Sequence, residues 1–167
     1  GRHAMMSLNV CESHIDVRCG HRLAGRYRHR HAYKPHVHPL NTPGGHTLSL
    51  DNPHDHRHHR GLFYSLRFAD CNFFEERETY GVQRHVGIED VVADGDTVRF
   101  THLIAWHRVE DDAEYLAERR TISCTHDPAG RAFVWTWCEH LEARRDLEVI
   151  KSQWSVPDAQ GTLINYH

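Results

Sequence analysis

The clearest pattern in the chain is an alternation of apolar and polar positions, with a period of two, in its second half. From residue 98 to residue 106, one side of this alternation holds Val98, Phe100, His102, Ile104 and Trp106. A period of two is typical of a β-strand with one buried face. Segments 116–124 and 133–139 show strand patterns too, and turn-forming residues lie at 93–96, 110–114 and 126–130. These features predict an antiparallel meander.

The fold class follows from what surrounds this meander. Shorter strand-like segments lie at 13–19, 33–40, 147–150 and 153–156, and no segment keeps a 3.6-residue apolar period over three turns. We therefore expect an all-β protein, an antiparallel β-sandwich or barrel-like fold with long loops in its first half. Residues 29–61 form the longest irregular segment and carry four of the six prolines. Ordered loops of this length are usually functional.

Composition limits the possible partners. The 167 residues suit one domain, which we expect at 6–167, with residues 1–5 as a cloning remnant. The net charge of -3 favours neither nucleic acid nor an anionic membrane surface. No apolar run approaches the ~20 residues of a membrane span. Five cysteines without CxxC spacing indicate reduced thiols and a cytoplasmic protein.

The best candidate for chemistry is the run Pro-His-Asp-His-Arg-His-His-Arg-Gly at residues 53–61. Half of the 18 histidines lie between residues 29 and 59, and histidine is the side chain that most readily ligates metals or moves protons near neutral pH. In an extended chain His54, His56 and His58 share one side, whereas on a helix Asp55 and His59 share a face. Histidines outside the run, such as His29, His31 and His85, are expected at the surface.

A metal site is one interpretation of this run. His36 and His38 are spaced to share a face of a strand, and could meet the run at one ion. The predicted ligands are His38, Asp55, His56 and His58, around Zn, Mn or Fe. A metal-free site that uses histidine and glutamate as acid and base stays open. The predicted catalytic residues are His38, His56, His59 and Glu76, with Asp55 orienting a histidine.

Three further residues are expected to bind substrate. Arg60 suits bidentate contacts to a substrate oxygen, or alternatively pairs with Asp55. Lys34 lies beside the predicted strand of His36. Trp135 belongs with Trp137 to an aromatic stripe, which is either core or a platform for a sugar ring.

Several segments resemble a bacterial family catalogued as "methane oxygenase PmoA-like", a domain of unknown function. They are 33–40, 42–45, 53–62, 72–75 and 164–167. The resemblance runs through most of the chain, and only its His-rich part is highly specific. It implies a β-sandwich like the large two-sheet sandwiches of sugar mutarotases. It also implies a role in carbohydrate metabolism, because family genes often lie beside sugar-oxidising dehydrogenases.

The resemblance also concerns chain length. Family members are usually longer, and residues 164–167 match only the start of an Asn-Tyr-His-Gly-Leu motif, so we expect the family's C-terminal part to be missing here. Uncovered sheet edges would then favour a dimer or another homo-oligomer.

The predicted function is a carbohydrate-processing enzyme: a lyase, hydrolase or epimerase acting on a sugar or oxidised glycoside. Its partner would be this small molecule, with no nucleic acid and no membrane. Two alternatives stay open. One is a non-catalytic carbohydrate-binding module that uses the tryptophan stripe. The other is a metal-binding or oxygenase-associated protein, as the family name suggests.

Overall fold

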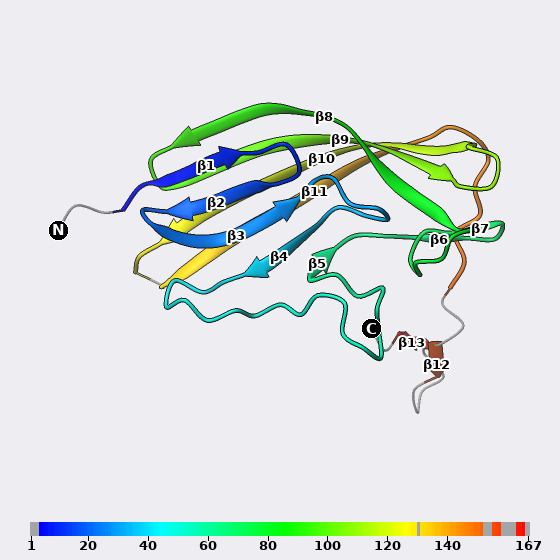
Figure 1. Ribbon diagram of the computed structural model, residues 1–167, viewed down its shortest axis with the longest axis horizontal. Helices are drawn as coiled ribbons and strands as arrows, with labels where there is room; N and C mark the ends of the chain where they lie inside the picture. Colours follow the sequence, from blue (N-terminus) through cyan, green and yellow to red (C-terminus); the bar gives the residue numbers. More distant parts are fainter. Residues whose placement is uncertain (1–3, 130, 152–154, 158–162, 166–167) are drawn as a thin grey trace.

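The computed structural model describes residues 4–129, 131–151, 155–157 and 163–165, the last two ranges by their backbone. Two antiparallel sheets pack face to face (Figure 1). One has the order β1 (Met6–Val10), β2 (Ile15–Cys19), β3 (Arg22–Arg28), β4 (His36–Leu40), β5 (Leu62–Phe63). The other has the order β11 (Ala132–Ala143), β10 (Glu114–Asp127), β9 (Thr97–Arg108), β8 (Gly81–Asp94). The predicted all-β sandwich is confirmed.

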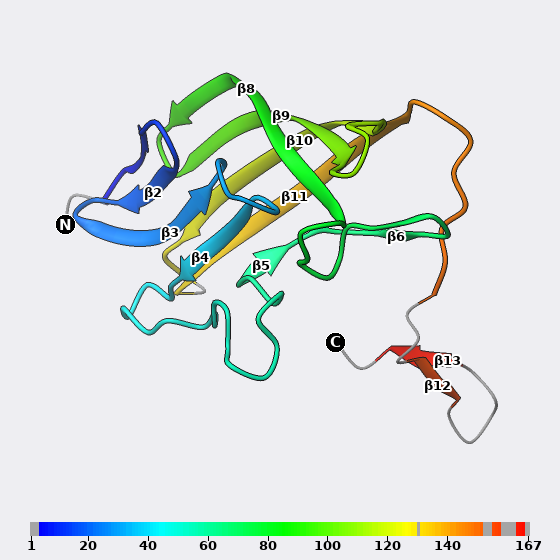
Figure 2. The ribbon, with the colours of Figure 1, turned by 45° about the vertical axis from the view of Figure 1, so that its right-hand side comes forward.

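Two small pairs of strands complete the described chain. They are β6 (Arg67–Phe68) with β7 (Cys71–Asn72), and β12 (Ser155–Pro157) with β13 (Leu163–Asn165). Figure 2 shows the β12–β13 pair apart from the two large sheets. The part of the chain that the structure describes contains no helix that could cross a membrane.

The predicted meander is confirmed as β9 to β11, and β8, which was not predicted, pairs with β9 at its edge. Val98, Phe100, Ile104 and Trp106 of β9 are at most 2% exposed. Val98 and Phe100 pack against the first sheet, whereas Ile104 and Trp106 pack in a second cluster with Phe68 and Phe73. Burying each such side chain contributes about 1.5–3 kcal/mol to folding. The pattern of apolar positions therefore located the buried face of this strand.

A polar network lies inside this interface. Arg120, which is fully buried, donates from Nε to Glu118 Oε1 (2.6 Å) and from Nη1 to the Tyr27 hydroxyl (3.2 Å). The Tyr27 hydroxyl also lies 2.7 Å from His102 Nδ1, and His102 Nε2 lies 3.0 Å from His85 Nδ1. The network therefore joins polar side chains of both sheets.

Other predicted elements differ. Segment 147–150 is irregular and lies antiparallel beside β6, where Val149 forms one isolated bridge with Phe68, so it extends neither large sheet. The strand predicted at 153–156 overlaps β12 only from Ser155. Parts of earlier predictions fall on residues 1–3, 130, 152–154 and 166–167, which lie outside the described residues.

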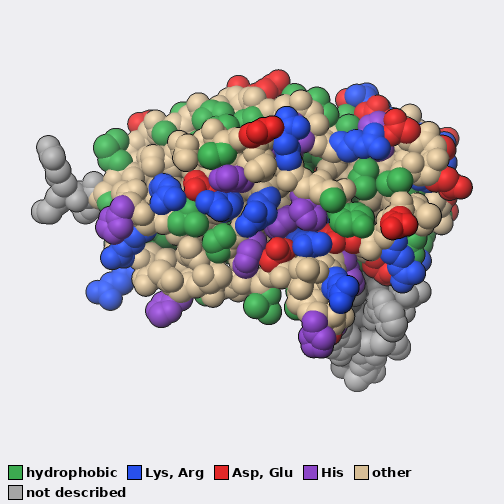
Figure 3. Space-filling model, in the orientation of Figure 1, with side chains coloured by type: hydrophobic (Ala, Val, Ile, Leu, Met, Phe, Trp, Pro, Cys, Tyr) green, Lys and Arg blue, Asp and Glu red, His purple; other side chains and the backbone are tan. Residues whose placement is uncertain are grey.

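The long segment predicted at 29–61 holds β4 and then a loop from residue 41 to residue 61. This loop lies along the free side of β4, and Gly61 leads into β5, which pairs His36 with Phe63. Histidine, basic and acidic side chains gather over the middle of this face of the molecule (Figure 3). The fold therefore brings the charged residues of several distant segments to one place.

Candidate functional site

The base of the site is a buried ammonium group. Lys34 is 0% exposed, donates from Nζ to the Phe74 carbonyl at 2.6 Å, and lies over the Phe63 ring at 4.2 Å. Its Nζ is 3.8 Å from Glu76 Oε1. Burial lowers the pKa of Lys34 to about 8, although the charge of Glu76 opposes this shift. Lys34 was expected to bind substrate, but its ammonium group is enclosed by protein and stabilises the site from beneath.

Arg60 and Glu76 form the charged wall above it. Arg60 donates from Nε to Glu76 Oε1 (3.0 Å) and from Nη2 to Oε2 (2.7 Å), a bidentate pair. Arg60 Nη1 also lies 3.6 Å from Asp51 Oδ1. The Glu76 side chain is 6% exposed and held between two cations, which makes it a poor general base. The partners predicted for Arg60 are also corrected, from Asp55 to Asp51 and Glu76.

Two histidines with opposite hydrogen-bonding roles face this wall. The rings of His31 and His36 lie 5.0 Å apart at 87°. His31 Nδ1 accepts from the backbone nitrogens of Tyr33 (3.2 Å) and Lys34 (3.4 Å), so the neutral ring carries its hydrogen on Nε2. His36 Nδ1 donates to the Lys34 carbonyl at 3.1 Å, so its Nε2 carries the lone pair.

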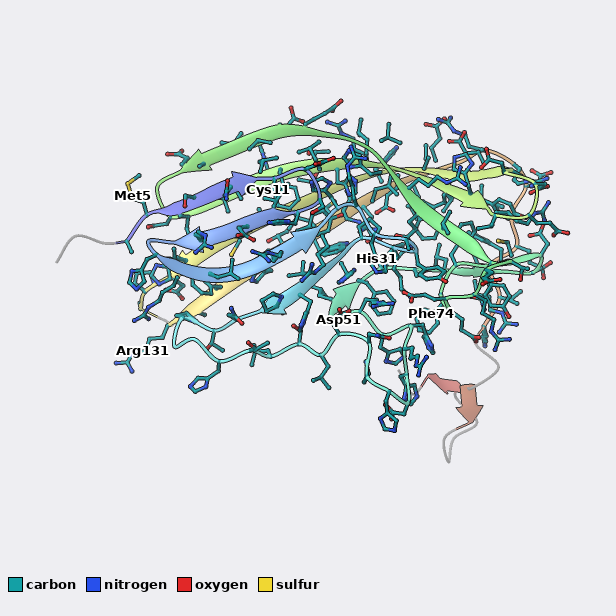
Figure 4. The ribbon with its side chains drawn as sticks, in the orientation of Figure 1. Met5, Cys11, His31, Asp51, Phe74 and Arg131 are labelled. Atoms are coloured by element: carbon teal, nitrogen blue, oxygen red, sulfur yellow. The ribbon has the colours of Figure 1, made fainter. Side chains whose placement is uncertain are left out.

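Burial keeps both rings neutral. It is the first cause that lowers the pKa of His31, and it lowers the pKa of His36 to about 4. The same short backbone segment therefore presents one imidazole as a donor and its neighbour as an acceptor at neutral pH. Figure 4 shows His31 and Asp51 close to β4 and β5, with Phe74 beside them.

Gly61 closes the loop that carries Asp51. It has a φ of +53°, and a Cβ there would lie 2.1 Å from the Val37 carbonyl oxygen of β4. Its nitrogen donates to the Leu50 carbonyl at 2.7 Å. Only glycine permits both this backbone conformation and this approach to the strand.

Replacing Gly61 with alanine is expected to lower the free energy of unfolding by about 2–5 kcal/mol, from left-handed strain plus a backbone clash. Gly95→Ala is the matched control, because Gly95 has a φ of +58° but nothing within 4 Å of the added Cβ. That variant should lose only about 1–2 kcal/mol. Urea denaturation of both variants measures the difference, and equal losses would contradict the role of the contact with Val37.

The histidine run itself has a different conformation from either predicted one. Residues 53–59 form two successive turns, with His56 N bonded to the Pro53 carbonyl and His59 N to the His56 carbonyl. Proline and the charged side chains leave this stretch in solvent, so the His54 side chain is 96% exposed and Asp55 is 60% exposed. The run is therefore neither strand nor helix.

The run does approach the site at one point. The ring of His59 lies 4.9 Å from that of His56 and 4.6 Å from that of His58. His58 packs on Phe74 at 5.4 Å. Asp55 Oδ2 lies 3.2 Å from His56 Nδ1, which agrees with its predicted orienting role.

The predicted metal ligands are not gathered around one point. His38 Nδ1 is 2.7 Å from Ser49 Oγ on the other part of the loop. Within the described residues, no group of three or more His, Cys, Asp or Glu side chains is placed to hold a metal ion. The set of His38, Asp55, His56 and His58 is thus not supported, because turns separate the run from β4. A bound divalent metal stays a prediction.

Trp135 was predicted to bind substrate, but its side chain packs in the core between the sheets. It lies on the inner side of β11, and with Trp137 it packs against the core between the sheets. A Cβ added to Gly25 would lie 2.9 Å from Trp135 Cζ2. The core interpretation of the tryptophan stripe is therefore supported over the sugar platform.

Sequence reasoning missed three residues of the site: His31, His36 as a proton carrier, and Asp51. His31 and His29 were expected at the surface, yet His29 is 3% exposed and burial lowers the pKa of His31. The available signal was the spacing of His31 and His36 around the short segment Tyr33-Lys34-Pro35. No local pattern marks Asp51.

Comparison with known proteins adds a family but no activity. No curated protein and no solved structure matches the chain. The resemblance to the PmoA-like family stays a prediction. Residues 14–155 match the model of a family described as "Family of unknown function (DUF6807)", and the chain belongs to that family.

Proposed function

We propose that this chain is an acid–base enzyme acting on a sugar or an oxidised glycoside, as a lyase, hydrolase or epimerase. The observation that carries the proposal is the pair His31 and His36, whose tautomers are fixed in opposite senses by the backbone of residues 33 and 34. Enzymes that move protons need one group that gives a hydrogen bond and one that takes a proton, held in fixed positions.

Each histidine then has a defined task. His36 Nε2 takes a proton, and the Lys34 carbonyl accepts the hydrogen bond from the other nitrogen, which stabilises the imidazolium that forms. His31 Nε2–H donates to an oxygen on which negative charge develops. Arg60, held by Glu76, keeps a positive charge beside Asp51 throughout. These steps require only groups that the structure brings together.

A carbohydrate suits the surroundings of this pair. Phe63 and Phe74 are half-buried rings 5.7 Å apart, and His58 packs on one of them. Apolar rings beside a few fixed polar groups are typical of small-molecule sites, and a sugar offers both an apolar ring face and hydroxyl groups. The link between the resembling family and sugar-oxidising dehydrogenases supports this class by association only.

The test is turnover of simple sugars and of glycosides with a ring ketone, followed by proton NMR in heavy water. This method detects proton exchange, elimination and hydrolysis in one experiment. His31→Gln and His36→Gln should each lower turnover by about 100-fold or more. His54→Gln is the matched control, because it changes an exposed histidine of the same region and should leave turnover unchanged.

Three outcomes would overturn the proposal: no turnover of any compound in the panel, full turnover by His31→Gln, or equal losses in all three variants. Thermal melts of each variant separate lost chemistry from lost folding. Turnover that falls in chelator and returns with Zn, Mn or Fe would support the metal-dependent version.

A further inference from the structure

Two buried acceptor atoms face each other in the proposed site. His36 Nε2 and Asp51 Oδ1 are 3.6 Å apart, which is too long for a direct hydrogen bond. Neither atom has a hydrogen-bond partner among the described residues, and each is buried. His36 as a whole is 0% exposed. Buried polar atoms are nearly always paired, so this arrangement calls for a physical explanation.

A direct bond cannot form in the neutral state of this pair. The hydrogen of the His36 ring is on Nδ1, where it is donated to the Lys34 carbonyl. Nε2 and the carboxylate oxygen are therefore both acceptors, and two lone pairs face one another. Only a group that brings hydrogens can satisfy both atoms.

The third neighbour, Arg60, determines which hydrogen-bonding pattern that group must have. Arg60 Nη1 lies 3.6 Å from the same Asp51 oxygen and can only donate. The site therefore offers two acceptors and one donor. A water molecule can donate to His36 and Asp51 and accept from Arg60, which gives it the three hydrogen bonds typical of buried water. A single sugar hydroxyl has only one hydrogen and cannot donate to both acceptors. A divalent cation would be repelled by the positive charge of the Arg60 guanidinium.

We propose that His36, Asp51 and Arg60 bind one water molecule, and that this water is the second reactant of the enzyme. The inference rests on the proposed function and narrows it, from the three reaction types, to hydrolysis of a glycoside.

The reaction balances with these groups and solvent water. His36 Nε2 takes a proton from the bound water as the water oxygen forms a bond to the anomeric carbon. The bond from that carbon to the leaving oxygen breaks on the opposite side of the carbon. His31 Nε2–H hydrogen-bonds to this leaving oxygen, which receives a proton from solvent water. The products are the free sugar and an alcohol, and His36 releases its proton to solvent and returns to its neutral form.

The first experiment tests the water site without using activity. A high-resolution crystal structure of the full chain should show a water molecule within hydrogen-bond distance of His36 Nε2, Asp51 Oδ1 and Arg60 Nη1. Nitrogen NMR should show His36 Nε2 without a hydrogen at neutral pH. A direct bond between His36 and Asp51, or a metal ion in this position, would overturn the inference.

Asp51→Asn is the informative variant. Its amide can donate directly to His36 Nε2 and so replaces the water, and we expect an unchanged or higher melting temperature together with a loss of turnover of about 100-fold. Asp112→Asn is the control, because Asp112 lies in the turn between β9 and β10, outside the proposed site, with a side chain 66% exposed, and should change neither quantity. Full turnover by Asp51→Asn would contradict the inference.

The second experiment follows the oxygen. Turnover in water enriched in heavy oxygen should place one labelled atom in the product, and an unlabelled product would overturn the role of water as reactant. If no glycoside is turned over at all, the proposed function fails, while the crystal structure and the nitrogen NMR still decide whether the water is bound.

Discussion

Replacing Glu118 with glutamine is expected to destabilise the fold by about 3–5 kcal/mol, which would be the largest effect of any single side chain considered for this protein. Glu118 accepts from Arg120 at both oxygens, at 2.6 Å and 3.1 Å, and from Trp106 Nε1 at 2.7 Å. Glutamine removes the negative charge and directs an amide donor at a guanidinium that only donates. Arg120 would then be a buried charge with only the more distant Glu139 as an acidic partner, at 3.9 Å.

The measurement is urea denaturation at neutral pH, with two comparison variants. Glu118→Gln combined with Arg120→Met removes the buried positive charge of Arg120. The double variant should recover part of the lost free energy of unfolding, because replacing both partners of a buried ion pair is often tolerated. Glu89→Gln breaks an exposed pair with Arg119, in which both side chains are 46% exposed, and should cost under about 1 kcal/mol. A Glu118→Gln variant as stable as Glu89→Gln would contradict the account of the network.

Strands β9 to β11 could be predicted from the sequence because their signal is local, whereas β1, β3 and β8 were not predicted. Along β9 and β10 each inner position is two residues from the next, so the alternation that predicted these strands also identified the face that is buried. The same alternation includes the polar residues of that face, which are His102, Glu118 and Arg120. Their positions could be predicted, but their pairing depends on Tyr27, which comes from the opposite sheet.

The site was predicted only in part, because its signal is not local. The histidine run was the strongest local feature, yet its turns leave His54 in solvent and only His58 and His59 approach Phe74. The residues that meet at the site come from separate segments. They are His31, Lys34, His36, Asp51, Arg60 and Glu76. Loop closure at Gly61 and the pairing of β4 with β5 bring these residues together. Neither feature produces a recognisable sequence pattern around Asp51.

Acid is expected to weaken the fold between neutral pH and pH 5 through two buried histidines. Burial lowers the pKa of His102 to about 2, with the charge of Arg120 as the next cause, and lowers that of His36 to about 4. In the unfolded chain both titrate near the ordinary value of about 6.5. As the pH falls below about 6.5, the unfolded state therefore binds protons that the folded state does not, and the free energy of unfolding decreases.

The loss should reach about 2 kcal/mol for each histidine by about pH 5, relative to about pH 7.5. Burial raises the pKa of Glu139 to about 7, so its protonation in the folded state offsets about 2 kcal/mol of the sum. Urea denaturation across this range measures it. His102→Gln should reduce the slope by about 1.4 kcal/mol per pH unit, whereas His54→Gln, at a position 96% exposed, should leave it unchanged. Paired carboxylates such as Asp16, whose pKa is lowered by its hydrogen bond with Arg26, titrate below this range. A slope that neither His36→Gln nor His102→Gln changes would mean that both histidines titrate in the folded protein as they do in the unfolded chain, and that the neutral His36 on which the proposed chemistry depends does not exist.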